Sequence, residues 1–323
     1  MKLPELSIGN IKLKNCLLLA PMAGISDLPL RELAISGGAG LVYTEMVSAT
    51  ALSYNDKKTY KLLKTSETEP IVAAQIFGNN PLVMAESAKK IQDLGYKIID
   101  INMGCPAKKI AKVNAGAKLL ENPSNIAKIL ETVVKSVSVP VTAKTRIGLT
   151  KGQNVAGEIL KIAQESGIKM LTIHARYAEN GHSGNPDIEA FEQAIADATI
   201  PVVANGGITD IKTAEKFLKV PKCSGLMIGR GAIGDYDIFK RIEAFFNGDK
   251  LLPAPSISKR INWLKKHVMA SVAFYGEQKG LVILRKIIPY YIKDIPNASQ
   301  IRNQFNKFTT LKEFNDLFSK FKF

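Results

Sequence analysis

An amide and a thiol stand where a predicted buried strand ends. The apolar run 97–101 is followed by Asn102 and then by Gly104, Cys105 and Pro106. Proline cannot donate to a strand ladder and glycine loosens the backbone, so the strand gives way to a loop here. If the strand belongs to a parallel barrel, this loop lies at the edge where active sites are built. The placement therefore predicts a chemical role for Cys105.

The thiol of Cys105 admits two chemical roles and one structural alternative. A free cysteine is usually a small buried hydrophobe, but the polar neighbours of Cys105 favour chemistry. A thiol with the ordinary pKa of about 8.5 is mostly protonated at neutral pH and can serve as a general acid. A thiolate nucleophile would need a histidine or a helix N-terminus beside it, and the sequence leaves that role open.

The three cysteines of the chain are too few and too scattered for a disulfide framework or a zinc site. We expect all of them to be reduced, with Cys16 and Cys223 in structural positions. No metal site is predicted.

Apolar runs at regular spacing predict the elements that would position Cys105. Eight such runs precede residue 232: residues 16–20, 40–44, 71–76, 97–101, 139–143, 170–174, 200–204 and 225–228. Near-continuous hydrophobic strands are typical of a parallel sheet covered by helices. Two of the covering helices are predicted to begin at Asn80-Pro81 and Asn122-Pro123, because asparagine caps a helix and proline suits its first turn. Their apolar positions are Ala85, Ala88, Ile91 and Leu94 in the first, and Ile126, Ile129, Leu130 and Val133 in the second.

Eight strand and helix units indicate an α/β fold of the (β/α)8 TIM-barrel type. A doubly wound open sheet is the alternative, but it would carry a glycine-rich fingerprint after the first strand, and residues 20–24 do not form one.

The character of the sequence changes after Pro253 and Pro255, where helical periodicity continues without further strands. We therefore predict two domains, a barrel in residues 1–250 and a small helical bundle in residues 251–323. The last helix has a capping-box start at Thr310 and Glu313 and an apolar stripe that runs to Phe321.

The charge of the chain points to an acidic polymer as a partner. The formal net charge is +15, with a pI of about 9.5, and residues 250–323 carry 14 Lys and Arg against 4 Asp and Glu. So basic a surface attracts phosphates along a nucleic acid. A membrane surface is the competing interpretation, but no apolar run approaches the roughly 20 residues of a spanning helix and the start lacks a signal-peptide core. We expect a cytoplasmic protein without a membrane span.

The carboxyl ends of the eight runs carry polar groups that would meet at one mouth of a barrel. In chain order they are Pro21-Met22-Ala23, Glu45, Gln75, Asn102 with Cys105, Lys144 with Arg146, His174 with Arg176, Asn205-Gly206-Gly207 and Gly229-Arg230-Gly231. Phosphates bind at glycine loops after strands seven and eight of many barrels, and Arg230 adds a charged partner. An isolated Gly-Gly usually only permits a tight turn, but two glycine loops in these two places favour a phosphate site.

Three of these residues have side chains that could bind a flat ligand ring. Lys144 could stabilise negative charge on a ring, and the Gln75 amide could pair with a ring amide through its donor and its acceptor. His174 alone would be interpreted as a core histidine, and only its place at a strand end favours a role in the site.

Taken together, these segments resemble the tRNA-dihydrouridine synthases, and most closely their bacterial B-type branch. The matching segments are residues 20–24, 75–78, 100–106, 144–148, 174–176, 204–207 and 228–231. They span the barrel in the right order, whereas the resemblance is weaker in the helical tail.

The resemblance implies an FMN-dependent reduction of the C5–C6 double bond of chosen uridines in tRNA, with NADPH as the reductant. Hydride would pass from the reduced flavin to C6 while Cys105 protonates C5, and Asn102 would help to orient the base. By the same resemblance the FMN contacts are Pro21, Met22, Ala23, Gln75, Lys144, His174, Asn205, Gly206, Gly207, Gly229 and Arg230.

A uridine stacked inside tRNA must be turned out to reach such a site, and phosphate contacts could compensate for that. The residues expected to bind the substrate are Asn102, Arg146, Arg176, Lys265, Lys266, Arg285 and Lys286, and His267 is a further basic candidate. The family often has a histidine after the Arg-Lys pair, where this chain has Ile287, and residues 177–184 match the family loop only loosely. The tRNA contact and the uridine position are therefore open. We expect a monomer.

Two alternatives remain from the residues. A flavin barrel acting on a small molecule such as dihydroorotate would share the phosphate loops but would not need a basic helical tail. A tRNA-binding barrel that has lost catalysis would not need Cys105, Lys144 and Gln75. The colour of the purified protein tests the second alternative, because a flavoprotein is yellow and a tRNA-binding barrel without flavin is not.

Overall fold

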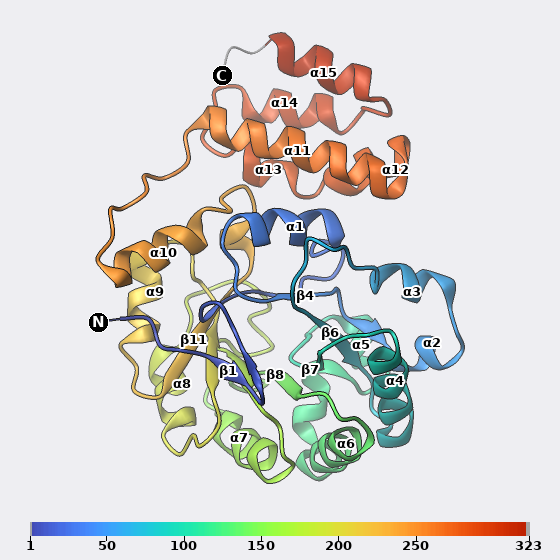
Figure 1. Ribbon diagram of the computed structural model, residues 1–323, viewed down its shortest axis with the longest axis vertical. Helices are drawn as coiled ribbons and strands as arrows, with labels where there is room; N and C mark the ends of the chain where they lie inside the picture. The colour runs from blue at the N-terminus through green and yellow to red at the C-terminus, as the bar shows by residue number, and fades with distance from the viewer. Residues whose placement is uncertain (1, 321–323) are drawn as a thin grey trace.

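The computed structural model of the chain describes residues 2–320, and eight parallel strands form a barrel at its centre (Figure 1). The strands are β3 (Leu17–Leu19), β4 (Val42–Tyr43), β6 (Val72–Phe77), β7 (Ile98–Met103), β8 (Val141–Arg146), β9 (Leu171–His174), β10 (Val202–Asn205) and β11 (Cys223–Ile228). Each falls on one of the eight predicted runs. The ring closes between its first and second strands, where Leu18 bridges to Leu41 and the Gly40 N–H donates to the Leu17 carbonyl at 2.7 Å. The predicted TIM-barrel fold is confirmed.

Helices follow the barrel strands along the chain, and the longer ones cover the outside of the ring (Figure 1). They are α1 (Leu28–Ser36), α2 (Ala49–Ser53), α3 (Lys57–Leu62), α4 (Pro81–Asp93), α5 (Lys108–Ala111), η1 (Gly116–Glu121), α6 (Pro123–Ser136), α7 (Ala156–Glu165), α8 (Ile188–Ile195), α9 (Ile211–Leu218), η2 (Arg230–Ala232) and α10 (Ile238–Asn247). A two-residue strand that the sequence did not indicate, β5 (Val47–Ser48), pairs with β6.

The two predicted helix starts are confirmed by their caps. The Asn80 side chain accepts from the Leu82 and Val83 N–H groups, and Asn122 accepts from the Asn125 N–H. The expected apolar stripes face the core, with one correction. Leu94 follows the last turn of α4 and is 50% exposed.

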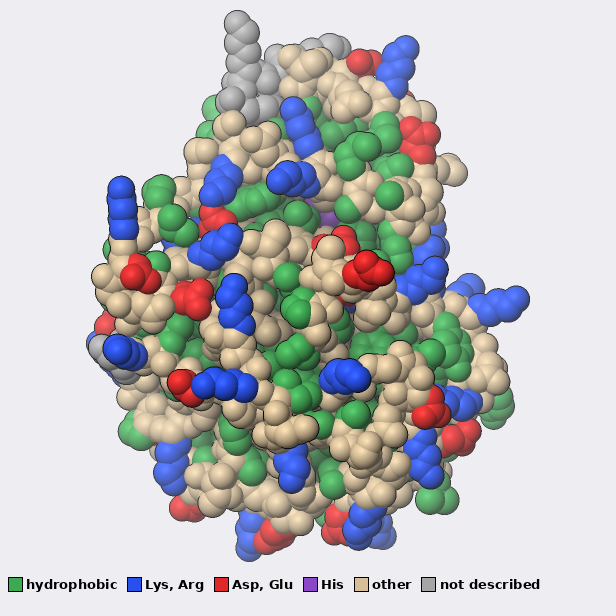
Figure 2. Space-filling model, in the orientation of Figure 1, with side chains coloured by type: hydrophobic (Ala, Val, Ile, Leu, Met, Phe, Trp, Pro, Cys, Tyr) green, Lys and Arg blue, Asp and Glu red, His purple; other side chains and the backbone are tan. Residues whose placement is uncertain are grey.

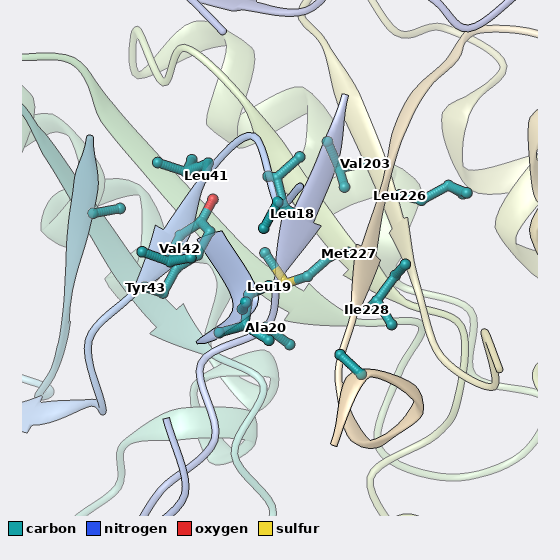
Figure 3. Close-up of a cluster of buried hydrophobic side chains, with 14 of the residues drawn as sticks. Leu18, Leu19, Ala20, Leu41, Val42, Tyr43, Val203, Leu226, Met227 and Ile228 are labelled. Atoms are coloured by element: carbon teal, nitrogen blue, oxygen red, sulfur yellow. The ribbon is translucent and has the colours of Figure 1, made fainter. Parts of the chain in front are cut away.

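Apolar side chains on both faces of the strands hold the barrel to its helices. Figure 3 shows part of this core, where Leu18 and Leu19 of β3 lie beside Val42 and Tyr43 of β4 and beside Met227 of β11. All five are buried. Because the strands are buried on both faces, they read in the sequence as continuous apolar runs.

A hairpin at the N-terminus lies against the amino ends of the strands. It consists of β1 (Ser7–Ile8) and β2 (Ile11–Lys12), and its turn residue Gly9 has a φ of +60°. A Cβ on Gly9 would lie 3.0 Å from Pro140, which directly precedes β8. With this end occupied by the hairpin, the carboxyl ends of the strands are the end where a site can form.

Five helices follow the barrel after a stretch, residues 248–256, without helix or strand. They are α11 (Ile257–Tyr275), α12 (Glu277–Leu284), α13 (Ile288–Tyr291), α14 (Ala298–Phe305) and α15 (Leu311–Lys320). They stack at one end of the molecule above α1 (Figure 1), and α11 contacts α1. The predicted capping box is present, since the Thr310 N–H donates to the Glu313 carboxylate at 3.0 Å and the Glu313 N–H donates to the Thr310 hydroxyl at 3.3 Å. Phe321, the predicted end of the stripe, lies outside the described residues.

The helical tail is docked on the barrel through a buried polar cluster. The Tyr291 hydroxyl lies 2.6 Å from the Tyr236 hydroxyl and 2.7 Å from Nδ1 of His267, and the Tyr236 ring meets Trp263 edge to face at 5.6 Å. His267 is therefore buried in this contact and is not a surface contact for phosphate, contrary to our expectation. Within residues 2–320, no helix is both long and apolar enough to cross a bilayer.

Candidate active site

A cavity of about 670 Å³ opens at the carboxyl ends of the strands. This volume lies in the usual range for a small-molecule or cofactor site. Each of the fifteen barrel residues predicted for the site lines it: Pro21, Met22, Ala23, Gln75, Asn102, Cys105, Lys144, Arg146, His174, Arg176, Asn205, Gly206, Gly207, Gly229 and Arg230. The carboxyl ends of the strands therefore bring these fifteen residues together at one cavity, whereas Glu45, which was expected at the same mouth, does not line it. The individual roles of these residues stay predictions.

Cys105 sits on a loop that is fixed from both sides. The Asn102 Oδ1 accepts from the Cys105 N–H at 3.0 Å and from the Gly104 N–H at 3.2 Å, and the Arg146 Nε donates to the Gly104 carbonyl at 2.7 Å. On the other side Gly116 has a φ of +63°, and a Cβ there would lie 2.6 Å from the Cys105 carbonyl oxygen. The half-buried thiol is thus held at the cavity wall without use of its own hydrogen bonds.

The cavity is electropositive. Lys144, Arg146, Arg176 and Arg230 line it, and none of the described residues that line it is Asp or Glu. Burial and the neighbouring Lys144 hold the pKa of His174 well below its usual range, and burial and Arg146 lower the pKa of His182. Neutral histidines among fixed cations suit a ligand that brings its own negative charge.

Lys144 is a buried cation without an ion-pair partner among the described residues. It is 9% exposed, its ammonium donates to Oδ1 of Asn205 at 3.0 Å, and it makes no salt bridge within residues 2–320. Burial, followed by the nearby Arg146, lowers its pKa from 10.5 to about 7. A buried ammonium with a lowered pKa in a cavity is a candidate partner for an anionic ligand.

The lowered pKa of Lys144 predicts how the stability of the ligand-free chain depends on pH. Between pH 7 and about 10.5 the unfolded chain holds a proton on Lys144 that the folded chain has released, so this residue makes stability rise with pH over that window. Lys144→Met should therefore be the more stable protein at pH 6, by an amount on the order of a few kcal/mol. Urea unfolding from pH 6 to 9 measures this, with Lys169→Met on the exposed surface as the matched control. The prediction is wrong if the two variants show the same pH dependence.

Two glycine loops lie beside these cations. Gly206 has a φ of +118°, and a Cβ on it would lie 2.8 Å from the His174 ring, so only glycine fits there. Gly207 has a φ of +67°. The N–H groups of Gly206, Gly207 and Gly229 donate to no other residue in the described range 2–320, which leaves them free for a ligand. The tip of the neighbouring loop is tied down by Arg230, which donates to the His182 carbonyl at 2.7 Å.

Comparisons with known proteins agree with this geometry. The model of the family described as "Dihydrouridine synthase (Dus)" matches residues 18–322. The chain belongs to the dihydrouridine synthase family. It is 40% identical over 299 residues to tRNA-dihydrouridine synthase B of Proteus vulgaris, with 93% of each chain covered. It is 38% identical over 306 residues to tRNA-dihydrouridine synthase B of Pasteurella multocida, with 95% of this chain and 92% of the relative covered. These relatives place the chain in the bacterial B-type branch of the dihydrouridine synthases, which are flavin-dependent oxidoreductases.

A solved structure supports the fold of this dihydrouridine synthase family member. Histamine dehydrogenase from Rhizobium sp. 4-9 superimposes with a TM-score of 0.58 at 13% identity, over 75% of this chain and 47% of that chain. A likeness at this sequence identity supports only the barrel fold of the chain.

The residues of the cavity fit the flavin that dihydrouridine synthases use. The free N–H groups of the two glycine loops and the guanidinium of Arg230 suit a phosphate, and Lys144 lies on the wall where a ring would be held. No group of His, Cys, Asp and Glu that could hold a metal ion occurs among residues 2–320.

Arg230→Ala should weaken the binding of the flavin and leave the backbone donors in place. A hydrogen bond to a charged group contributes about 1.5 to 3 kcal/mol, so the dissociation constant should rise by roughly tenfold to a hundredfold. Fluorescence titration with FMN of protein from which the flavin has been removed measures this dissociation constant. Lys212→Ala on the exposed face of α9 is the control. Parent-like affinity in Arg230→Ala would move the phosphate site elsewhere.

The basic tail residues do not line the cavity, and they differ in their surroundings. Lys265 and Lys266 are exposed on α11, whereas Arg285 is half-buried and donates to the Phe308 carbonyl at 2.9 Å. Lys286 reaches back to the barrel, since a Cβ on Gly24 would lie 2.5 Å from its Nζ. On the face in Figure 2, Lys and Arg side chains are spread over barrel and tail with Asp and Glu between them. The basic excess is therefore not one continuous patch on that face.

Sequence reasoning missed several residues that line the cavity, among them Tyr290 and His182. Tyr290 comes from the helical tail, and His182 comes from the loop after β9, with its ring 6.2 Å from that of His174. No strand-end rule could find Tyr290, because it depends on how the tail docks. The signal for His182 was present in the sequence, since it is one of only three histidines and follows a strand end by eight residues.

Proposed function

We propose that this chain reduces the C5–C6 double bond of uridines in tRNA, with FMN as its bound flavin and NADPH as its reductant. It would act in the cytoplasm and as a monomer. Membership of the dihydrouridine synthase family and relatives named tRNA-dihydrouridine synthase B support the reaction. The choice of FMN, of NADPH and of the individual residues is our inference.

One observation carries the assignment of roles. The thiol of Cys105 lies on the wall of a cavity that four cations line and that no Asp or Glu among the described residues lines. An electropositive cavity of this kind favours a phosphate-bearing cofactor and a polyanionic substrate together. A thiol at its wall can supply a proton to a base that enters it.

The residues of the chain divide the chemistry between them. The glycine loops and Arg230 would hold the FMN phosphate, with Pro21, Met22, Ala23, Gln75, Lys144, His174 and Asn205 against the rest of the cofactor. When bound, the reduced flavin supplies hydride for C6 of the uracil. Cys105 would then give its proton to C5, and Asn102, which already fixes the Cys105 loop, would orient the base. The cations Arg146 and Arg176 are proposed to contact the substrate at the cavity.

The basic tail would bind the tRNA outside the cavity, through Lys265, Lys266 and Lys286, with Arg285 beside them. A base turned out of the stack loses a few kcal/mol of stacking and pairing, and phosphate contacts of the tail can offset that loss. We infer that residues 251–323 act as the tRNA-binding domain and residues 1–250 as the FMN-binding domain.

The direct test uses the purified full chain. Its bound flavin is released and identified, and the chain is then incubated with unmodified tRNA and either NADPH or NADH. Dihydrouridine should form in the tRNA and form faster with NADPH. Mapping dihydrouridine in tRNA from cells that lack the chain then identifies the uridine. Flavin-loaded protein that leaves tRNA unchanged but oxidises dihydroorotate or reduces orotate would favour the small-molecule alternative. Colourless protein that binds tRNA would favour a non-catalytic barrel.

A further inference from the structure

A carboxylate lies directly beneath the cavity. Asp100 is 0% exposed, points into the barrel from β7, and does not line the cavity itself. In the sheet register it is paired with Gln75 of β6 on one side and with Thr142 of β8 on the other. It therefore cannot touch a ligand, and any effect on the site must pass through its neighbours.

A chain of hydrogen bonds connects Asp100 to the Cys105 loop. Gln75 Nε2 donates to Asp100 Oδ2 at 2.7 Å, and Asn102 Nδ2 donates to Gln75 Oε1 at 2.9 Å. Asn102 Oδ1 in turn accepts from the Cys105 N–H at 3.0 Å. The Thr142 hydroxyl fixes the other carboxylate oxygen at 2.6 Å.

The direction of this chain follows from its first member. An ionised carboxylate only accepts hydrogen bonds, so Gln75 must present its NH₂ group to Asp100. The Gln75 carbonyl oxygen then faces Asn102, so Asn102 must donate to it with its own NH₂ group. That leaves the Asn102 oxygen toward the N–H groups of Gly104 and Cys105. The charge of Asp100 at one end of the chain and the N–H groups of Gly104 and Cys105 at the other thus favour the same orientation of both amides.

Stability of the fold does not account for this carboxylate. Burial raises the pKa of Asp100 from 3.8 to about 6, so its ionised form is disfavoured in the folded chain. A group whose folded pKa is raised contributes its stabilisation below the unfolded pKa and loses it as pH rises through the folded one. Above pH 6 the charge of Asp100 therefore weakens the fold, and its benefit must lie elsewhere.

We propose that Asp100 is a positioning residue for the reaction: its buried charge orients the amides of Gln75 and Asn102 and thereby holds the Cys105 loop in place. The inference rests on the proposed function for the role of Cys105 as proton donor. The positioning itself can be measured without tRNA or flavin.

Asp100→Asn is the decisive variant, because it keeps the shape and removes the charge. Its amide can accept or donate, so Gln75 and Asn102 are no longer forced into one orientation. In the inverted arrangement the Asn102 NH₂ group would face the N–H groups of Gly104 and Cys105, and the loop would lose its acceptor. Alkylation of Cys105 by iodoacetamide at pH 8, followed by mass spectrometry of the full chain, should accelerate about threefold or more as the loop opens. The buried Cys16 and Cys223 serve as internal references.

Two further variants separate orientation from general loosening. Thr142→Val removes the other partner of Asp100 but keeps its charge, so Cys105 should be alkylated at the parent rate. Asp100→Asn combined with Gln75→Glu moves the negative charge from residue 100 to residue 75. The carboxylate there still accepts from the Asn102 NH₂ group, so the combined variant should restore the parent rate of alkylation. If Asp100→Asn alone fails to fold, Gln75→Met takes its place, because it breaks the chain at its second link and should accelerate the alkylation of Cys105 in the same way.

The proposal is overturned if Asp100→Asn is alkylated at the parent rate, if Thr142→Val is accelerated equally, or if the combined variant stays accelerated. With tRNA as oxidant, Asp100→Asn should also slow reoxidation of the reduced enzyme by roughly tenfold to a hundredfold, as a misplaced catalytic group does. Parent protein that is inactive on tRNA would contradict the proposed function while leaving the alkylation results to decide the positioning.

Discussion

Replacing Cys105 by alanine is expected to slow the reduction of tRNA by about 10² to 10⁴, because general acid catalysis by a positioned side chain is typically worth that much. The fold and the flavin site should survive. The hydrogen bonds that hold the loop come from the backbone N–H groups of Gly104 and Cys105 and not from the thiol. Stopped-flow absorbance of the flavin measures reduction by NADPH and reoxidation by tRNA separately. The first should be nearly unchanged and the second slow.

Two controls make this result specific. Cys223→Ala removes a buried thiol at the start of β11, outside the cavity, and should retain the parent rates. Cys105→Ser keeps a hydroxyl in place of the thiol, and because a hydroxyl is a far weaker acid, it should remain close to the alanine variant. Reoxidation by tRNA at the parent rate in Cys105→Ala would exclude Cys105 as the proton donor.

The barrel could be predicted because its strands are buried on both faces. Each strand gave a continuous apolar run, and parallel strands with helical crossovers leave few arrangements for eight such units. The carboxyl ends of parallel strands must then meet at one end, which is why residues as far apart as Met22 and Arg230 could be assigned to one cavity. The positions of residues at strand ends thus predict, from local sequence patterns alone, which residues line one cavity.

The features that the sequence did not reveal depend on contacts between segments that are far apart in the chain. His267 belongs to a helix whose surface residues Lys265 and Lys266 are basic, so it was grouped with them, but the docking of Tyr291 and Tyr236 buries it. Tyr290 reaches the cavity for the same reason. Asp100 lies in the matching segment 100–106, but the sequence assigned it no role, because its neighbours on β6 and β8 follow only from the sheet register.

The same docking decides how the proposed tRNA surface should be tested. Removing residues 251–323 would expose Tyr236 and the α1 surface that α11 covers, so aggregation could be mistaken for lost binding. Charge changes on the surface avoid this. Arg285 is best left intact, because its bond to the Phe308 carbonyl holds the tail together. Burial raises the pKa of Glu45 and the nearby Lys286 opposes that rise, so Lys286 is better neutralised than reversed.

The variant with Lys265→Glu, Lys266→Glu and Lys286→Gln should therefore bind tRNA about 10²-fold more weakly at 0.1 M salt. Each phosphate contact contributes about 0.9 to the slope of log affinity against log salt on duplex and about 0.7 on single strands, so the loss of three contacts should lower the slope by roughly two to three. The matched control is Lys128→Glu, Lys169→Glu and Lys161→Gln, which changes the net charge equally on exposed residues of α6, α7 and the segment before β9. In Figure 1 helices α6 and α7 lie at the end of the molecule opposite the tail. Filter binding over a salt series compares the three proteins. Because a general effect of net charge would lower both slopes alike, only a fall confined to the tail variant supports the proposed surface, and an unchanged slope there would place the phosphate contacts elsewhere on the chain.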